Sequence, residues 1–426
     1  MAKVVRQQLV SNLDAGLSRK DRASGRYDAY VPDRLVGRSF VLDSETAADV
    51  VDAEVAIHRL DSEASALVHT EALSRLLLRA EAIASSRIEG LEVGARRLLR
   101  ADVARQLGGA SSDVTAVEVL ANIDAMAVVT DAVGPGELIT GDILLEIHRR
   151  LLAGTSIASH GGHLREVENW IGGSSFNPCS AEFVPPPPEY VTVLIEDLIE
   201  FCNSDDLPAV AQAAIAHAQF EAIHPFIDGN GRTGRALIHL ILRRRGVAER
   251  VIAPVSLVLA TWSDRYVDGL TKFRYLGSPE SAQAVSGLNT WVARFAAACS
   301  RAAADAMHFE ATAADLHETW RKRVAPVRAN SALDVLLDRL IGMPILTATT
   351  AAKLIGRSFP ATNAAIERLA EAGILRQVTV GRRNRAFESP DALSAFTALE
   401  RRLASPLGDT RVSDPPRPVP RRAQGR

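Results

Sequence analysis

The chain has 426 residues, of which 47% are hydrophobic and 23% charged, and its formal net charge is −2. This composition indicates a globular protein with room for two or three domains, and the near-neutral charge argues against a whole-protein attraction to nucleic acid or anionic membranes. The three cysteines lack paired spacing, which argues against a zinc site or a disulfide framework and fits a reducing compartment. The N-terminus lacks the apolar segment of a secretory signal, and no apolar run approaches the ~18 residues of a membrane span, so we expect a cytoplasmic protein without a membrane contact.

Helical periodicity dominates the first part of the chain. Apolar residues recur at intervals of three and four over 52–90, 115–133 and 141–154, which predicts amphipathic helices. The segment 160–190 differs, because VENWI and EFV are short enough for strands and GGSSFNPCSA between them can turn the chain. PPPP at 185–188 must be extended. Further helices are predicted over 191–203, over 209–223, and from about Arg232 to Gly246.

The composition shifts near 325–332, which suggests a second structural unit. The pattern then predicts helices over 333–342, 347–356 and 360–373, followed by short strands over 374–380 and 385–389. That order is typical of a winged helix-turn-helix. Residues 401–426 contain seven arginines, two aspartates and five prolines, which predicts a disordered basic tail.

A polar loop, HPFIDGNGRTGR at 224–235, lies between two apolar helical segments. Glycines allow a backbone to approach a phosphate closely, and the free N–H groups at the start of the next helix favour an anion. Arg232 and Arg235 lie three apart on that helix and can grip two phosphates with their forked guanidinium groups. Asp228 is a hard oxygen ligand suited to Mg²⁺, and His224 is suited to general-base work. A glycine-rich loop or a single histidine is a weak signal, but the combination is much more specific.

This stretch resembles the Fic family signature, H-x-F-x-[D/E]-G-N-G-R-x-x-R, at every fixed position. GHLREVENWIGG followed by EFVPPPP resembles the flap of the family. The helical N-terminal region and the winged-helix pattern resemble the long bacterial Fic architecture.

The resemblance implies a mainly α fold: a Fic helical bundle core with a short β-hairpin flap, plus a C-terminal winged helix-turn-helix. We expect an N-terminal helical region over 1–115, a catalytic core over 116–270, a helical connector over 271–325, the winged helix over 326–400, and the tail over 401–426.

The resemblance also implies AMP transfer from ATP to a Tyr, Thr or Ser hydroxyl of a target protein, or of the chain itself. His224 would deprotonate the hydroxyl, and Asp228 would hold Mg²⁺ between the phosphates. The anion hole and the phosphate grip would come from the rest of the nucleotide-binding stretch: Gly229, Asn230, Gly231, Arg232, Thr233, Gly234 and Arg235. Doc-like kinases have Lys where this sequence has Gly231, so Gly231 favours nucleotidyl transfer over phosphorylation.

Two other contacts follow from the resemblance. A flap strand would pair with the backbone of the target, and the candidate residues are Glu168, Asn169, Trp170, Ile171, Gly172 and Gly173. Tyr266 is the candidate contact for the adenine base. Simple core packing is the alternative for both Trp170 and Tyr266.

Residues 85–90, SSRIEG, resemble the inhibitory motif of the family, [S/T]-x-x-x-E-[G/N], through Ser85, Glu89 and Gly90. The implied mechanism is competition, in which Glu89 pairs with Arg235 in place of the γ-phosphate. In some Fic proteins this glutamate positions water to remove AMP, so deAMPylation by the same site stays open.

A second hypothesis is a DNA-binding regulator in which the Fic domain serves as a sensor. The second helix of the predicted winged helix has only Arg368 as a basic residue, while its wing has Arg382, Arg383 and Arg385. That is a thin footprint for specific DNA binding, and winged helices also mediate protein contacts. The intact His224 and Asp228 favour the enzyme, and the sequence leaves a homo-oligomer open.

Overall fold

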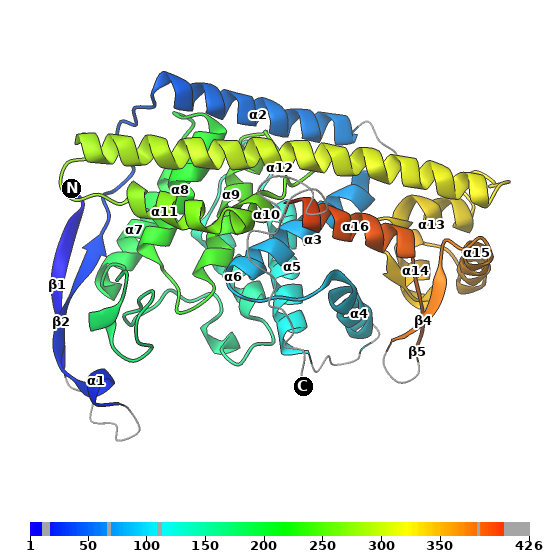
Figure 1. The fold of residues 1–426 in the computed structure, drawn as a ribbon, viewed down its shortest axis with the longest axis horizontal. Helices are drawn as coiled ribbons and strands as arrows, with labels where there is room; N and C mark the ends of the chain where they lie inside the picture. The colour runs from blue at the N-terminus through cyan, green and yellow to red at the C-terminus, as the bar shows by residue number, and fades with distance from the viewer. Residues whose placement is uncertain (11–17, 66–69, 107, 109–112, 381–383, 404–426) are drawn as a thin grey trace, which may run out of the picture. The chain divides into compact units, whose positions relative to one another are not determined.

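The computed structural model describes residues 1–10, 18–65, 70–106, 108, 113–380 and 384–403. The described chain is mostly helical with two small antiparallel sheets, which confirms the mainly α fold class (Figure 1). It divides into two compact units. The first contains Met1–His58, Ala121–Glu249 and Asp264–Ser300, and the second contains Arg59–Leu120, Arg250–Ser263 and Arg301–Arg426.

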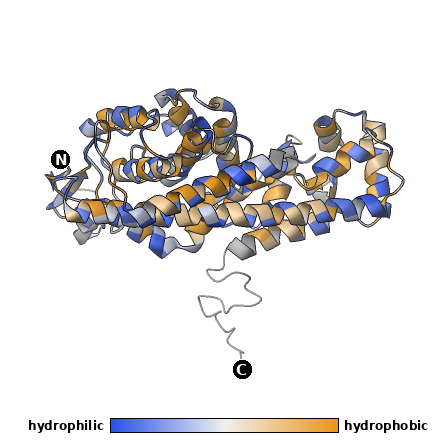
Figure 2. Cartoon of the chain, turned by 90° about the horizontal axis from the view of Figure 1, so that it is seen from above, coloured by the Kyte–Doolittle hydropathy of each residue, from blue (hydrophilic) through white to orange (hydrophobic). Residues whose placement is uncertain are grey.

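The division into units cuts across the domains predicted from the sequence. Three helices are divided between the units well inside their length, namely α2 (Ser44–Ser65), α5 (Val114–Ala132) and the long α12 (Ala282–Arg323). The first 58 residues therefore group with the segment that contains the polar loop, and residues 59–120 group with the C-terminal part. Hydrophobic and hydrophilic residues alternate along the helices of both units, as expected for amphipathic helices (Figure 2).

The N-terminal part of the first unit is a β-hairpin. Strands β1 (Lys3–Leu9) and β2 (Gly25–Val31) pair antiparallel, with Lys3 opposite Val31 and Leu9 opposite Gly25. The prediction of a helical region from residue 1 is wrong for these segments. They are rich in Val, Tyr and Gln, and Tyr27, Ala29 and Val31 of β2 are buried at every second position, which is the period of a strand. The short α1 (Arg19–Arg22) lies between the strands.

The remaining elements of the first unit are helical: α6 (Gly141–Leu152), η1 (Ala158–His160), η2 (Pro178–Ser180), α7 (Pro188–Cys202), α8 (Ala209–Ile223), α9 (Asn230–Arg244) and, but for its first residue, α11 (Ser263–Phe273). All residues of α8 except Glu221 are buried, and seven of the fifteen are alanines. Small side chains let α9 approach closely. A Cβ atom on Gly234 would lie 2.8 Å from Phe220 Cδ1. The pair α8–α9 therefore forms a rigid frame on both sides of the polar loop.

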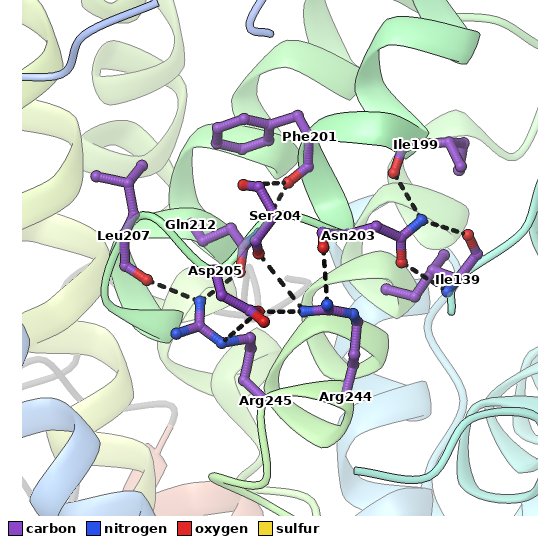
Figure 3. A network of polar contacts seen from close by, with 10 residues as sticks. All are labelled: Ile139, Ile199, Phe201, Asn203, Ser204, Asp205, Leu207, Gln212, Arg244 and Arg245. Atoms are coloured by element: carbon purple, nitrogen blue, oxygen red, sulfur yellow. Dashed lines mark hydrogen bonds and ion pairs between the residues drawn. The ribbon is translucent and has the colours of Figure 1, made fainter. Parts of the chain in front are cut away.

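A polar network joins the C-terminal ends of α7 and α9 (Figure 3). Asn203 caps α7 and clamps Ile139 in both directions, since its Oδ1 accepts from Ile139 N at 2.8 Å and its Nδ2 donates to Ile139 O at 2.7 Å. Arg244 donates to Asn203 O at 2.7 Å and to Asp205 Oδ1 at 2.6 Å. Since α9 is 15 residues long, roughly 22 Å separate this network from the start of the helix.

The second unit contains α3 (Thr70–Ile88), α4 (Ala95–Gln106), α10 (Val255–Thr261), α13 (Ala332–Leu340), β3 (Ile345–Leu346), α14 (Ala348–Ile355), α15 (Phe359–Glu371), β4 (Arg376–Val380), β5 (Asn384–Glu388) and α16 (Pro390–Leu403). The strands form one antiparallel sheet in the order β3-β5-β4. The predicted order of helices and strands over 333–389 is observed, and its identity as a winged helix stays a prediction. The predicted tail begins inside α16, and its residues 404–426 lie outside the described residues.

Helix α4 attaches to this sheet. Leu99 and Val103 pack with Ile345 and Ala386. The fully buried carboxylate of Glu388 accepts from Arg376 Nε at 2.6 Å and from Arg96 Nη2 at 3.0 Å. Within the described segments, none of the helices has both the length and the apolar character needed to cross a bilayer.

Candidate active site

The polar loop is bounded by two residues in the left-handed backbone region. His224 ends α8 with φ 50° and ψ 60°, and its N–H donates to Phe220 O at 2.8 Å. Gly229 precedes α9 with φ 76° and ψ 11°, and a Cβ atom there would lie 2.8 Å from Leu151 Cδ2. Glycine is therefore required at position 229 for both conformation and space. The next helix begins at Asn230, two residues before the predicted start.

Asn230 braces the loop from inside. Its Oδ1 accepts from Phe226 N, and its Nδ2 donates to Phe226 O, both at 2.8 Å. Phe226 is fully buried, and its ring stacks on the imidazole of His148 with 3.7 Å between the centroids. The amide of Asn230 is thus used to shape the loop, which leaves only the backbone N–H of this residue for an anion.

His148, which the sequence reasoning missed, supports the loop from α6. Its Nδ1 accepts from Gly162 N at 3.0 Å, so Nε2 carries the proton and donates to Asp228 O at 3.0 Å. Burial lowers the pKa of His148 to about 4, so the ring is neutral at physiological pH. The available signal was a histidine at a buried position of the α6 pattern, which by itself indicates burial and no role.

Arg232 is a buried cation that forms a long ion pair through one of its three guanidinium nitrogens. The residue is 5% exposed, and its Nε and Nη1 have no hydrogen-bond partner in the described part of the chain. The nearest carboxylate oxygen, Asp228 Oδ1, lies 3.8 Å from Nη2. Burying a charge with so few partners is costly, so this arginine at the start of α9 is prepared for an anion.

The other residues of the motif surround the same helix start. The His224 side chain is 17% exposed, and its Nδ1 lies 3.9 Å from Glu221 Oε2. Thr233 is fully buried, and its hydroxyl has no partner among the described residues. Arg235 is 1% exposed. The structure therefore brings the predicted base and both arginines together around one helix N-terminus.

A metal site made by the protein alone is not present in the described segments, where no three His, Cys, Asp or Glu residues gather. Asp228 is 57% exposed, and its Oδ1 accepts from Gly229 N at 2.6 Å. A single accessible carboxylate fits Mg²⁺ only where substrate phosphates supply further ligands.

The flap is held by two isolated bridges, Ile171 with Phe183 and Ser174 with Asn177, and contains no regular strands, so the prediction of strands there is wrong. Ile171 N donates to Phe183 O at 2.8 Å, and Phe183 N donates to Ile171 O at 3.2 Å. Gly172 and Gly173 follow with φ of 75° and 72°, which turns the chain before a longer pairing can form.

The two residues on either side of Asn169 pack on the N-terminal hairpin. Tyr27 of β2 donates a hydrogen bond to Glu168, and burial raises the pKa of that carboxyl group. Trp170 packs with Tyr27 and Val184, and its Nε1 donates to Ser174 O at 2.6 Å. The geometry of Trp170 is that of a packed aromatic, which was the alternative considered for it.

Arg165 is a second residue that the sequence reasoning missed. It is 3% exposed, and its Nε donates to His224 O at 2.8 Å. Asn169 Nδ2 donates to the same carbonyl at 3.2 Å and to Phe226 O at 2.8 Å. The quoted flap segment contained Arg165, but a sequence does not distinguish a buried arginine from a surface one.

Tyr266 lies in the core. It is 6% exposed, its hydroxyl lies 2.8 Å from His217 Nε2, and its ring packs on His217 and Trp291. This packing is the alternative considered for Tyr266, and it gives no support to an adenine contact. Burial lowers the pKa of His217 to about 3.

The inhibitory motif lies in the second unit. Ser85 is buried within α3, while Glu89 directly follows the last residue of the helix and is exposed. Gly90 ends the segment with φ 81°.

In the structure, fewer basic side chains are available to contact DNA than the sequence predicts. Arg368 of α15 donates from Nη2 to Val324 O at 2.9 Å and to Pro326 O at 3.1 Å. Arg385 donates to Gln377 Oε1 at 2.9 Å, and Arg382 and Arg383 lie outside the described residues. The only basic side chain of the second helix is therefore engaged by main-chain carbonyls.

Comparison with known proteins gives two family matches. Residues 138–242 match the Fic/DOC family model, and residues 47–131 match the Fic/DOC family N-terminal model. The protein adenylyltransferase fic-1 of Caenorhabditis elegans is 34% identical over 136 residues, which are 31% of this chain and 25% of that protein. The protein adenylyltransferase Fic of Drosophila willistoni is 38% identical over 112 residues, which are 26% of this chain and 20% of that protein. The chain thus spans a quarter or less of the length of these curated relatives.

Among solved structures, a Fic family protein from Desulfovibrio desulfuricans G20 aligns with a TM-score of 0.48 and 20% identity over 82% of this chain and 97% of that chain. A fragment of Fic-1 from C. elegans aligns with a TM-score of 0.45 and 23% identity over 62% of this chain and 74% of that chain. With the two family models matched in consecutive segments and the full signature present at 224–235, the chain contains a Fic domain preceded by a segment similar to the Fic/DOC N-terminal model.

Proposed function

We propose that the chain transfers AMP from ATP to a hydroxyl group of a target protein or of itself. The observation that carries the proposal is Arg232, a buried guanidinium with two unpartnered nitrogens, among the described residues, at the N-terminus of α9. A polyphosphate supplies the anion that such a group needs. The helix N-terminus adds backbone N–H donors, whose partial positive charge also attracts an anion. The curated relatives named above, both protein adenylyltransferases, support the same reaction.

In the proposed reaction, Arg232 and Arg235 hold the β- and γ-phosphates while the start of α9 receives the α-phosphate. The target oxygen forms a bond to the α-phosphorus, the bond from that phosphorus to the β-phosphate oxygen breaks, and pyrophosphate leaves. His224 takes the hydroxyl proton, because an imidazole is a competent general base near neutral pH. The catalytic effect then rests on orientation and on neutralisation of charge.

Asp228 would hold Mg²⁺ jointly with the phosphates, and the ion would supply further neutralisation of the leaving charge. The contribution of the chain at this point is the exposed carboxylate itself. One of its oxygens accepts from the N–H of Gly229 at 2.6 Å, and the other would be the ligand of the ion.

Glu89 is the proposed brake on this reaction. An exposed carboxylate at the end of α3 would compete with the γ-phosphate for Arg235. A preference of about 2.7 kcal/mol for the closed arrangement keeps roughly 99% of the molecules inactive, and one partly buried Arg–carboxylate pair can supply that amount.

The test uses ATP labelled at the α-phosphate and, in parallel, at the γ-phosphate, with Mg²⁺ and the purified chain. We expect label transfer from the α-position only, stronger in Glu89→Gly than in the wild type and absent in Glu89→Gly combined with His224→Ala. Transfer from the γ-position would identify a kinase and contradict the proposal. Equal transfer in wild type and Glu89→Gly would refute the brake, and release of AMP from a prelabelled protein would reveal deAMPylation by hydrolysis.

A further inference from the structure

The carbonyl group of His224 is held by two side chains of the flap segment. Arg165 Nε donates to it at 2.8 Å, and Asn169 Nδ2 donates to it at 3.2 Å. His224 adopts φ 50° and ψ 60°, a left-handed conformation that is strained for a residue with a side chain. A backbone in this region persists only when its surroundings impose it, so these two donors have a direct part in orienting His224.

All three nitrogens of the Arg165 guanidinium group donate hydrogen bonds to main-chain carbonyls. Besides the bond to His224, Nη1 donates to Val167 O at 3.0 Å, and Nη2 donates to Pro186 O at 2.5 Å and Ile223 O at 3.4 Å. The backbone N–H of Arg165 itself donates to Pro225 O at 2.9 Å. Burial lowers the pKa of Arg165 to about 10, so the group remains charged at neutral pH. One side chain therefore joins the flap, the proline run before α7 and the end of α8.

Asn169 contacts the loop on both sides of Pro225. Its Nδ2 is shared between the carbonyls of His224 and Phe226, while its buried Oδ1 has no partner within the described residues. A buried amide oxygen without a hydrogen-bond partner lowers the stability of the fold, so stability alone does not account for an asparagine at position 169. Ile171, two positions later, is the residue whose backbone pairs with Phe183 in the flap. The segment proposed to receive the target is thus bonded directly to the residue proposed as the base.

We propose that Arg165 and Asn169 are positioning residues, which set the direction of the His224 side chain toward a hydroxyl presented on the flap. The inference rests on the proposed transfer reaction and goes beyond it, because it links target docking and base position through two side chains. Neither residue has a described contact with Arg232 or with the start of α9. Their loss therefore lowers the rate of transfer and spares nucleotide binding.

The kinetic test uses the Glu89→Gly chain as the parent and compares Asn169→Ala, Arg165→Lys and Arg244→Lys. Lysine keeps the charge of Arg165 but has no fork to reach several carbonyls at once. Arg244 is the matched control, since it is 6% exposed and bonded to Asn203 O and Asp205 at the far end of α9. We expect kcat to fall about tenfold or more in the first two variants, with KM for ATP within a factor of about two, and neither to change in the control.

Two outcomes would overturn the inference: an unchanged kcat in Asn169→Ala and Arg165→Lys, or a parallel loss of kcat and ATP affinity, which indicates general damage to the fold. A readout that needs no activity separates this inference from the proposed function. Carbethoxylation of His224 by diethylpyrocarbonate, followed by peptide mass spectrometry, should change in rate in Asn169→Ala and stay constant in Arg244→Lys. If the Glu89→Gly parent is inactive but the rate of His224 carbethoxylation changes in Asn169→Ala, only the transfer reaction is refuted. If that rate does not change, the positioning role is refuted.

Discussion

Removal of the Asn230 amide should lower both the stability of the chain and its affinity for ATP, and a control variant can distinguish the two effects. In the Asn230→Ala variant, Phe226 loses both hydrogen bonds from position 230. Phe226 O retains a donor, because Asn169 Nδ2 still reaches it at 2.8 Å. Phe226 N has no other acceptor among its described contacts, and the residue is fully buried.

The magnitude follows from these two atoms. A lost hydrogen bond contributes about 1 kcal/mol, and a buried donor left unsatisfied costs about 1–3 kcal/mol more. The free energy of unfolding should therefore fall by about 2–4 kcal/mol. For a unit of this size, a loss of that magnitude lowers Tm by roughly 5–15 °C.

Asn203 offers a control of the same chemistry at a different place. Its amide clamps Ile139 in both directions with bonds of 2.8 and 2.7 Å (Figure 3). Asn203→Ala should reduce stability by a similar amount, but it lies at the C-terminal end of α7, away from the start of α9.

The assay is thermal unfolding with and without ATP and Mg²⁺, together with a direct measurement of ATP affinity. We expect both variants to melt early, and only Asn230→Ala to lose the upward shift of Tm that a bound ligand produces. Equal ATP affinity in Asn230→Ala and wild type would refute the reasoning. An equal loss of affinity in Asn203→Ala would refute it as well, since affinity would then report overall stability.

Three other predictions concern buried ionisable side chains. Arg232→Met should weaken ATP binding about 100-fold yet leave Tm without nucleotide unchanged or higher, because it removes a buried cation with two nitrogens that lack hydrogen-bond partners in the described part of the chain; a lower Tm would contradict this. Because burial lowers the pKa of His217 to about 3 in the folded chain, its stability contribution is complete above the unfolded pKa of about 6.5 and is lost as the pH falls toward 3. Between about pH 6.5 and 5 this loss is about 2 kcal/mol, and unfolding experiments should show a smaller loss in His217→Phe. Glu388→Ala should lower the free energy of unfolding by only about 1 kcal/mol, measured with denaturant, because Arg96 and Arg376 are about half exposed and exchange the lost hydrogen bonds for water.

Much of the fold and the loop was predictable from short-range patterns. The spacing of apolar residues predicted α8 and α9 to within two residues, since the period of a helix is a local property. The stretch from His224 to Arg235 predicted a helix N-terminus with two arginines, and the structure has both there. Predictions failed where the local signal was short, as in the flap, where Gly172 and Gly173 turn the chain and only isolated bridges form.

The amino-acid order alone was enough to predict most of the helices, the glycine-rich polar loop and the resemblance to the Fic signature, because each depends on residues that are neighbours in the chain. The surroundings of that loop became apparent only in three dimensions. His148 lies 80 positions before Asp228, and Arg165 lies 59 before His224, yet each is bonded to that residue. The burial of Tyr266 against His217 likewise depends on the packing of distant helices. Burial and hydrogen bonds between remote segments depend on how all segments of the chain pack together into one core. No local sequence pattern encodes that packing.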